Sequence, residues 1–334
     1  MRKRSSGRLG VSIALLSASF ASVFGAGAAK AAITIPMVPV GNAGNAADPS
    51  TGFGAVAYSY NIGQTDVTAT QYTAFLNAVA QTDTYGLYNS NMASSSAAAG
   101  ISQSGSSGSY TYATTKNGNF PVDYVTWGDA ARFANWLTNN QPVGAEGNGT
   151  TETGSYTLNG ATTDAALIAV TRNANANYVI PTENEWYKAA YYNPASSSYY
   201  LYTTSSNTQP SNVLSATGTN NANYYNGGYT DPTNYLTPVA AFADSVSPYG
   251  TYDQGGDVFQ WNESVYSGSY RGLRGGSFYN TYGYLRSGTY FYGAPTGEYD
   301  DIGFRVSQVP EPASMGVLSL GVAGMLVRRR GARR

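Results

Sequence analysis

Three segments of the chain space their apolar residues like an amphipathic helix, and each begins at a residue that can cap a helix. In the first segment the apolar stripe runs from Tyr72 to Val79 and follows Thr68. Thr68 and Gln71 have the spacing of a capping box, in which each side chain accepts a hydrogen bond from the other residue's backbone amide. The stripe therefore predicts a helix that begins at Thr68.

The second and third predicted helices have the same start signal. Thr126 is followed three residues later by Asp129, ahead of an apolar face that continues to Leu137. Thr182 is followed by Glu185 at the same spacing. Large aromatic side chains on such faces are typical of a hydrophobic core, and core packing is a simpler expectation for them than a ligand role. This expectation covers Trp127, Trp136 and Trp186.

Polar stretches of low complexity separate the helices. Residues 94–118 are rich in Ser, Ala and Gly, and residues 143–165 are rich in Gly and Thr. Neither stretch has a helical or strand period, so we expect surface loops or short hairpins of one domain. After residue 234 come short aromatic runs, such as 259–261 and 303–306, broken by Gly and Asn. These runs predict strands of a twisted antiparallel sheet.

The first 31 residues have the layout of a secretory signal peptide. Four basic residues at 2–8 precede an apolar run over 11–24, and a small-residue cleavage site follows at 29–31. The alternative is a membrane anchor, but the apolar run is shorter than the roughly 20 residues that a membrane-spanning helix needs. We therefore expect signal peptidase to remove residues 1–31 during export.

Residues 309–334 have the layout of a second targeting signal. The sequence Val-Pro-Glu-Pro at 309–312 is followed by an apolar run at 315–327 and by five arginines. Such a tail is expected to stop transiently in the inner membrane, with the arginines in the cytoplasm. It resembles the PEP-CTERM sorting signal, which implies removal by an exosortase and delivery to the cell surface or extracellular matrix of a Gram-negative-type bacterium. The alternative is a simple C-terminal anchor.

Composition and charge then exclude several kinds of chemistry. The chain has no cysteine and no histidine, so it offers no disulfide, no thiolate ligand and no imidazole. Ten of the 18 basic residues lie in 1–31 and 310–334, with only one of the 19 acidic residues, Glu311. The segment 32–309 therefore has 8 basic and 18 acidic residues, a net charge of −10. This charge argues against nucleic acid or anionic membrane as partners and suits hard cations.

Five sequence blocks in a fixed order resemble one protein family. They are residues 121–137, 180–186, 249–256, 273–277 and 303–306, the last two reading Leu-Arg-Gly-Gly-Ser and Gly-Phe-Arg-Val. The blocks are similar to the formylglycine-generating enzyme (sulfatase-modifying factor) domain, over residues 32–308. The resemblance implies an elaborated C-type-lectin-like fold, a single α+β domain with little regular secondary structure.

The residues that carry the family's activity are replaced in this chain. The resemblance implies oxidation of a sulfatase cysteine to formylglycine, with a copper ion held by two thiolates, the soft ligands that Cu(I) prefers. The equivalent positions are Asn280 and Leu285. We therefore expect no bound copper and no formylglycine-generating activity. A related branch that binds iron through histidines is excluded because the chain has none.

Calcium is the other ion that the resemblance implies, at two structural sites. The first set of ligands is the Asn223 side chain, the Tyr224 carbonyl, the Asp231 carboxylate and the Thr233 carbonyl. The second set is Asp253, the carbonyls of Gly256 and Val258, and Gln260, which stands where the family has a carboxylate. One carboxylate in each set predicts modest affinity, suited to extracellular calcium. The alternative is that the Asn and Asp residues of these sets only form turns.

The other charged residues of the blocks have structural explanations. Arg274 and Arg305 are expected to pair with carboxylates inside the fold. Glu183 and Glu185 are two residues apart on a helix, so they face different directions and do not form the carboxylate pair of a glycosidase. The acidic cluster at 298, 300 and 301 is expected to be a solvated turn.

Two functional classes follow from these features. The first is an exported cell-surface or matrix-associated protein whose calcium-stabilised, non-catalytic domain recognises polysaccharide or a surface protein. Rigid tyrosine rings suit such recognition and stack on sugar rings. The alternative is an enzyme of the same superfamily with a changed, cysteine-independent reaction, which would need a buried pair of ionisable groups in its groove. The expected ligand surface consists of Tyr279, Tyr282, Tyr284, Tyr290 and Tyr292.

Overall fold

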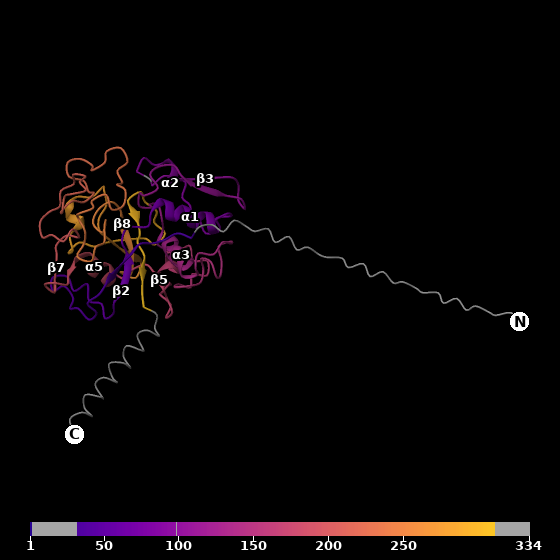
Figure 1. Cartoon of the computed structure of the whole chain (residues 1–334), viewed down its shortest axis with the longest axis horizontal. Helices are drawn as coiled ribbons and strands as arrows, with labels where there is room; N and C mark the ends of the chain where they lie inside the picture. Colours follow the sequence, from indigo (N-terminus) through magenta and orange to yellow (C-terminus); the bar gives the residue numbers. More distant parts are fainter. Residues whose placement is uncertain (2–31, 98, 311–334) are drawn as a thin grey trace, which may run out of the picture. The chain divides into compact units, whose positions relative to one another are not determined.

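The computed structural model describes residues 1, 32–97 and 99–310 (Figure 1). Apart from Met1, the signal peptide expected at 1–31 lies outside the described residues. The sorting tail from residue 311 onward, with its apolar run 315–327, also lies outside them. Among the residues that are described, no helix is both long and apolar enough to cross a membrane.

The three helices predicted from their start signals are confirmed. Each has a complete capping box, in which a threonine and the residue three positions later accept hydrogen bonds from each other's backbone amides. The helices are α1 (Ala69–Val79) after Thr68, α3 (Trp127–Thr138) after Thr126, and α5 (Glu183–Tyr191) after Thr182.

The remaining elements are short, as expected for a fold with little regular structure. The other helices are α2 (Asn91–Ser94), α4 (Asp164–Ala169) and the 3-10 helix η1 (Tyr282–Leu285). The first strands are β1 (Met37–Val40), β2 (Tyr60–Gly63), β3 (Ile101–Ser104), β4 (Thr111–Thr114), β5 (Tyr178–Val179), β6 (Tyr192–Asn193) and β7 (Ser198–Tyr199). The later strands are β8 (Phe259–Tyr266), β9 (Tyr270–Arg274), β10 (Phe291–Gly293), β11 (Ile302–Gly303) and β12 (Ser307–Gln308).

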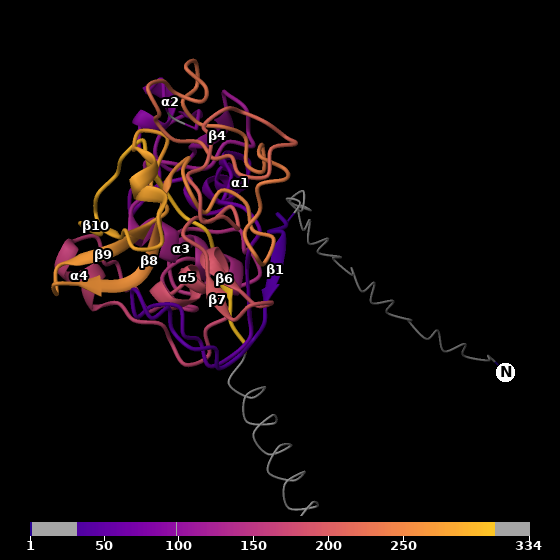
Figure 2. The ribbon, with the colours of Figure 1, turned by 90° about the vertical axis from the view of Figure 1, so that its left-hand side faces the viewer.

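Two four-stranded sheets contain most of the strands. The first sheet has the order β1-β2-β12-β5 and is antiparallel throughout. The second has the order β10-β9-β8-β11, and Figure 2 shows β8, β9 and β10 close together next to α4. A separate hairpin, β3–β4, lies within the stretch 94–118, where a loop or short hairpin was predicted.

The second sheet differs from the predicted antiparallel sheet in one strand pair. β11 runs parallel to β8, with Ile302 opposite Phe259 and Gly303 opposite Gln260. Of the run 303–306, only Gly303 lies in a strand. The prediction was wrong here because alternation within a strand shows which face is buried and carries no information about the direction of its neighbour.

The residues between β11 and β12 cross from the second sheet to the first. Phe304, Arg305 and Val306 are fully buried along this crossing. The Phe304 ring packs edge-on against Phe133 of α3, with ring centroids 5.3 Å apart. The last described part of the chain therefore joins both sheets to the helical side of the core.

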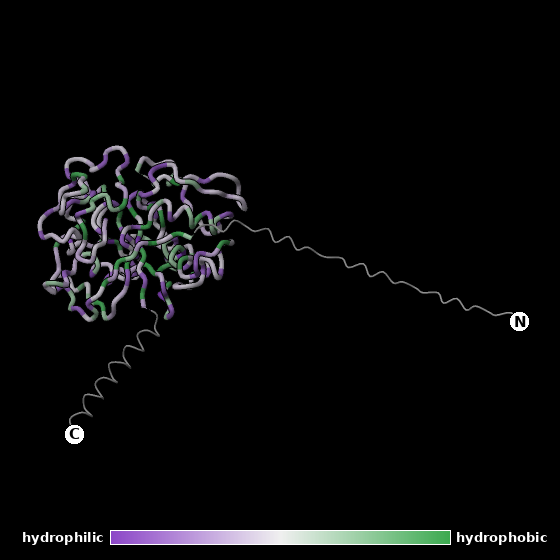
Figure 3. Tube along the Cα trace, viewed as in Figure 1, coloured by the Kyte–Doolittle hydropathy of each residue, from purple (hydrophilic) through white to green (hydrophobic). Residues whose placement is uncertain are grey.

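The hydrophobic core confirms the packing role predicted for the tryptophans. Trp127, Trp136 and Trp186 are each at most 3% exposed. Phe75 of α1 contacts Phe133 of α3 edge-on at 5.4 Å, so the two predicted helical faces meet. In Figure 3 the hydrophobic parts of the trace run mainly through the interior, and the polar loops lie around it.

A buried ion network separates the roles of Glu183 and Glu185. Arg172 donates two hydrogen bonds to Glu185, each of 3.0 Å, and one of 2.9 Å to Glu263. The Tyr58 hydroxyl also donates to Glu185. Glu183 lies on another face of α5, where it meets Arg274, so the expectation that the two glutamates face apart is confirmed.

The partner of Thr126 in the capping box of α3 is an acid that is costly to ionise. Asp129 is 2% exposed, and its Oδ2 accepts a hydrogen bond of 2.9 Å from the Thr126 amide. Burial raises the pKa of Asp129 to about 7, although Arg132 and Thr126 act in the opposite direction. The folded protein therefore keeps a proton at this site at pH 5 that the unfolded chain has released.

We predict that Asp129→Asn becomes more stable relative to the wild type as the pH rises from 5 to 8. A pKa raised in the folded state makes stability fall as the pH rises through that range, and asparagine keeps the acceptor without a proton to lose. At 1.36 kcal/mol per pKa unit, the difference in unfolding free energy between the variant and the wild type changes by about 1–3 kcal/mol from pH 5 to pH 8. Urea unfolding of both proteins at both pH values measures it. Other titrating groups cancel in the comparison, so a constant difference would contradict the raised pKa.

Candidate functional site

The position that the resemblance assigns to the first family cysteine holds a hydrogen-bonded asparagine. Asn280 Oδ1 accepts hydrogen bonds from the Ser277 amide at 3.1 Å and the Ser277 hydroxyl at 2.8 Å. The same hydroxyl lies 3.0 Å from Asp301 Oδ2. Burial raises the pKa of Asp301. The acidic cluster at 298, 300 and 301 is thus half-buried, where the sequence led us to expect a solvated turn.

The position that the resemblance assigns to the second family cysteine belongs to a hydrophobic cluster. Leu285 ends η1, is 1% exposed, and packs with Tyr202, Ala222 and Tyr224. Within the described ranges there is no group of three or more His, Cys, Asp or Glu side chains that could hold a metal ion. An amide and a leucine cannot replace two thiolates as ligands of Cu(I).

Exposed aromatic rings gather on the second sheet. Tyr266 at the end of β8 stacks on Tyr292 of β10, with centroids 4.3 Å apart and 15° between the ring planes. Phe291 stacks on Tyr292 at 5.8 Å, and Tyr290 contacts Tyr266 at 5.4 Å. Apart from the half-buried Tyr266, these rings are 38–46% exposed. We call this surface the aromatic strip: Tyr266, Tyr270, Tyr284, Tyr290, Phe291 and Tyr292.

The register of the sheet explains why the rings stand together. β10 is an edge strand, and its Tyr292 lies opposite Gly272 of β9, which has no side chain to displace the ring. At the far end of the β8–β9 hairpin, Tyr266 lies opposite Tyr270. The Tyr270 ring also contacts Tyr292, at 5.1 Å. Cross-strand neighbours on one face of a sheet are within reach of each other, so the rings form a continuous surface.

A hollow of about 320 Å³ opens beside the aromatic strip, lined by Phe53, Glu183, Asn184, Val265 and Tyr290 among others. Of the lining residues in the described part of the chain, Glu183 alone is charged, and the Arg274 Nε donates to Glu183 Oε1 at 2.6 Å. Arg274 also lies under the Tyr290 ring, 5.7 Å from its centroid. The expected pairing of Arg274 with a carboxylate is confirmed, and so is that of Arg305, whose guanidinium lies 3.3 Å from Asp66.

The predicted ligand residues fall into two groups. Tyr284, Tyr290 and Tyr292 belong to the aromatic strip. Tyr279 packs instead against Phe278 at 6.4 Å, and Tyr282 makes no ring contact among the described residues. The sequence reasoning missed Phe53, Tyr266 and Tyr270, which come from distant parts of the chain. Tyr266 and Tyr270 could have been found from the sequence, because one tyrosine stands on each side of the Ser-Gly-Ser turn at 267–269.

The first calcium set contains an oxygen that fits an ion. Asn223 Nδ2 donates to the Tyr235 carbonyl at 2.8 Å and to Asp257 Oδ1 at 2.9 Å, which fixes the orientation of the amide. Its Oδ1 is buried and has no hydrogen-bond partner. Burial, and next the charge of Asp253, raise the pKa of Asp257 to about 8. A buried oxygen without a partner beside a carboxyl group is suited to a cation.

Asp231 and Tyr224 of the first set are already engaged in part. Asp231 Oδ1 accepts hydrogen bonds from the amides of Thr233 and Asn234, at 2.8 and 3.0 Å, which is the turn geometry of the alternative reading. The Tyr224 carbonyl accepts a weaker bond of 3.2 Å from Asn212. Carboxylate and carbonyl oxygens each have further lone pairs, so these contacts are compatible with an ion.

The second calcium set does not fit an ion in this arrangement. Gln260 Oε1 accepts two hydrogen bonds of 2.6 Å, from Trp186 Nε1 and Arg305 Nε, which use both of its lone pairs. Gln260 Nε2 donates to the Asp253 carbonyl at 2.7 Å. The Gln260 side-chain N–H therefore already contacts the Asp253 carbonyl, and the positively charged Arg305 guanidinium lies next to the same side chain.

The architecture, the block order and the replaced cysteines define a lectin-like α+β domain without the metal-binding thiolates. The model of the Sulfatase-modifying factor enzyme 1-like domain matches residues 36–309, and the chain belongs to this family. The PEP-CTERM protein-sorting motif matches residues 308–330. This signal makes the protein an exported, envelope-associated protein of a Gram-negative-type bacterium, processed by exosortase-type machinery.

One solved structure, that of CarF, supports the α+β fold. The crystal structure of CarF is 22% identical, covers 83% of this chain and 99% of its own, and has a TM-score of 0.52. Treponema denticola variable protein 1 (18% identity, 82% and 95% covered, TM-score 0.47) and PvdO from Pseudomonas aeruginosa (18%, 82% and 94%, 0.49) also match. Such distant likeness shows the fold and leaves function to the site. A comparison with curated proteins found no match.

We predict that Gln260→Glu creates a calcium requirement. The change removes the donor to the Asp253 carbonyl and places two oxygens there, which is unfavourable unless a cation lies between them. The variant should melt at a lower temperature than the wild type in EDTA and recover part of the loss in 10 mM calcium, the order of concentration that weak extracellular sites need.

The matched control is Gln254→Glu, which makes the same change at a glutamine that is 1% exposed and outside both calcium sets. It should lose stability without a calcium response. Equal calcium responses of the two variants would show that the Gln260 position cannot be converted into an ion site.

Proposed function

We propose that the mature protein is a surface or matrix component whose domain binds polysaccharide through the aromatic strip and performs no catalysis. The aromatic strip carries this proposal, because its rings are largely exposed and stack on one another. A tyrosine ring presents an apolar face to the C–H face of a sugar, and its hydroxyl reaches a sugar hydroxyl. The ligand that fits is therefore an uncharged polysaccharide.

The chemistry of the adjacent hollow supports binding over catalysis. An enzyme would need a free acid or base facing its substrate. Among the described lining residues, Glu183 is the one that carries a charge, and its carboxylate is paired with Arg274. This ion pair links α5 to β9, so the carboxylate is already engaged by the protein itself.

The proposal includes a calcium ion with a structural role, bound by the first set of predicted ligands, which contains Asn223. The unpartnered Asn223 Oδ1 and the nearby Asp257 support an ion there. The ion would link the segment at 223–235 to the residues before β8, and so stabilise loops that have little secondary structure of their own. It would take no part in binding at the aromatic strip.

We predict that Tyr292→Ala weakens binding about tenfold. The binding measured is that of the mature domain to the extracellular polysaccharide of the bacterium that produces it. Loss of one stacking ring removes about 1–1.5 kcal/mol, and 1.4 kcal/mol is a factor of ten in affinity. Tyr279→Ala is the matched control, since Tyr279 is 66% exposed and lies outside the aromatic strip. Binding is measured by calorimetry or co-sedimentation. If both variants bind as the wild type does, the aromatic strip is not the binding surface.

We predict that calcium raises the melting temperature of the mature domain and that Asn223→Leu abolishes the rise. A dissociation constant of about 1 mM gives about 1.4 kcal/mol at 10 mM calcium. For a domain of this size, that corresponds to a rise of roughly 3–6 °C. Magnesium serves as the control cation, because it demands shorter bonds and stricter geometry. A rise that survives in Asn223→Leu would place the ion elsewhere.

A further inference from the structure

The folded domain ends directly at the sorting motif. β12 (Ser307–Gln308) lies between β2 and β5 and pairs with both of them. The amide of the next residue, Val309, donates to the Asn177 carbonyl at 3.0 Å. The sorting-motif match begins at residue 308. Pro310, the first residue of the Pro-Glu-Pro sequence, therefore follows a residue that is still hydrogen-bonded to the domain.

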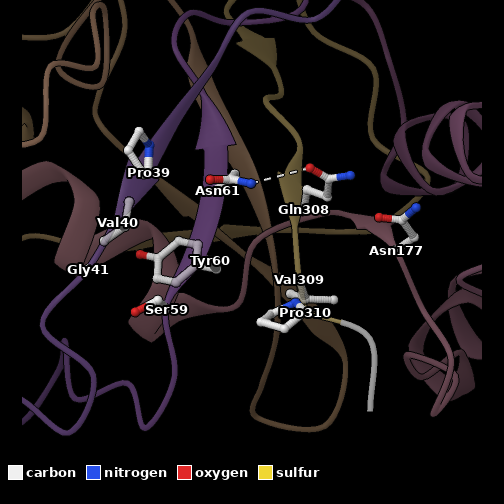
Figure 4. A pocket seen from close by; sticks show the side chains of 10 residues that line it. All are labelled: Pro39, Val40, Gly41, Ser59, Tyr60, Asn61, Asn177, Gln308, Val309 and Pro310. Carbon is white, nitrogen blue, oxygen red and sulfur yellow. Dashed lines mark hydrogen bonds between the residues drawn. The ribbon is translucent and has the colours of Figure 1, made fainter. Parts of the chain in front are cut away.

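A hollow of about 540 Å³, the exit hollow, lies at this point (Figure 4). It is lined by the end of β1, by the start of β2 with the preceding Ser59, by Asn177 and by residues 308–310. Asn61 donates across the sheet to Gln308 Oε1 at 3.3 Å. Among the residues that the structure describes, none in the lining is charged, and the wall offers amide groups beside apolar surface. The exit hollow belongs to the first sheet and is separate from the aromatic strip on the second.

The short distance between the domain and the motif limits how an enzyme can reach the tail. An extended residue spans at most about 3.6 Å, so two residues of chain after Val309 reach about 7 Å at most. A helix with its side chains is about 10 Å thick, and packed sheets are about 10 Å apart. The walls of an enzyme that encloses the Pro-Glu-Pro sequence are thicker than this reach. Such an enzyme must contact the domain around the exit hollow.

Release of β12 would give the tail more reach, but at a high structural cost. β12 is an interior strand, so its release breaks pairing on both sides and opens the first sheet in the middle. Ser307 is fully buried, and Val306 before it is part of the core. Contact with the folded surface requires none of these changes.

We propose that the exit hollow is a docking site for the exosortase-type sorting peptidase, so that the folded domain takes part in the recognition of its own tail. The uncharged wall fits an uncharged segment of the enzyme that can exchange hydrogen bonds with Asn61 and Asn177. Recognition then extends beyond the Pro-Glu-Pro sequence to the surface from which it emerges.

The test is the rate of tail removal from the full chain, expressed in a bacterium that has the sorting system. Ser59→Trp fills the exit hollow from an exposed position. We expect tail removal about ten times slower than in the wild type, which corresponds to a loss of about 1.4 kcal/mol of binding. Ser106→Trp is the matched control, because Ser106 is exposed in the turn between β3 and β4. It should be processed at the wild-type rate.

Pulse-chase labelling and the mass of the product measure the rate, and thermal unfolding checks that both variants fold. Wild-type processing of Ser59→Trp, or equal slowing of both variants, overturns the proposal. A six-residue Gly-Ser insert between Val309 and Pro310 adds about 20 Å of reach, so the enzyme can bind the motif away from the domain. In that background Ser59→Trp should have no effect on the rate. Persistent slowing would show that the substitution does not act through docking next to the motif.

Discussion

The buried guanidinium group of Arg305 holds the two sheets together where the chain crosses between them. It donates to the Gly63 carbonyl of β2 at 2.9 Å, to the Tyr252 carbonyl at 2.8 Å and to Gln260 of β8 at 2.6 Å, and it pairs with Asp66. A charge without access to water is tolerated only where its donors are satisfied inside the protein. The relative positions of β2, β8 and the loop before β8 therefore depend on one side chain.

The same constraint extends along β8 to the exposed surface. Gln260, the partner of Arg305, lies opposite Arg274 at one end of the β8–β9 hairpin, and Tyr266 lies opposite Tyr270 at the other. Arg274 is also buried, and its NH1 donates to the carbonyls of two residues, 287 and 289, in the segment that leads into β10. Two buried arginines thus fix the inner end of the hairpin and the approach to its edge strand. The aromatic strip can be exposed and still ordered because the strands beneath it are held from inside.

The parts of this fold that the sequence predicts are the local ones. A capping box lies within four residues, so all three long helices could be predicted from threonine and its partner three positions later. The parallel pairing of β11 with β8 joins residues more than 40 positions apart, and nothing in either strand specifies it. The same holds for the aromatic strip. Tyr284, Tyr290 and Tyr292 are close in sequence and were predicted, whereas Tyr266 and Tyr270, which the sheet brings next to Tyr292, were not.

The residues that depart from the family pattern share one physical feature, since each is satisfied by the protein itself. Leu285 fills a hydrophobic cluster, and the Gln260 amide donates to the Asp253 carbonyl. Each of these buried groups therefore has its partner inside the fold, as buried polar and apolar side chains generally do. Asn223 differs from them, since its buried Oδ1 still lacks a partner. If the chain has kept one ion of its family, this unmet oxygen is the physical reason to look for it at Asn223 first.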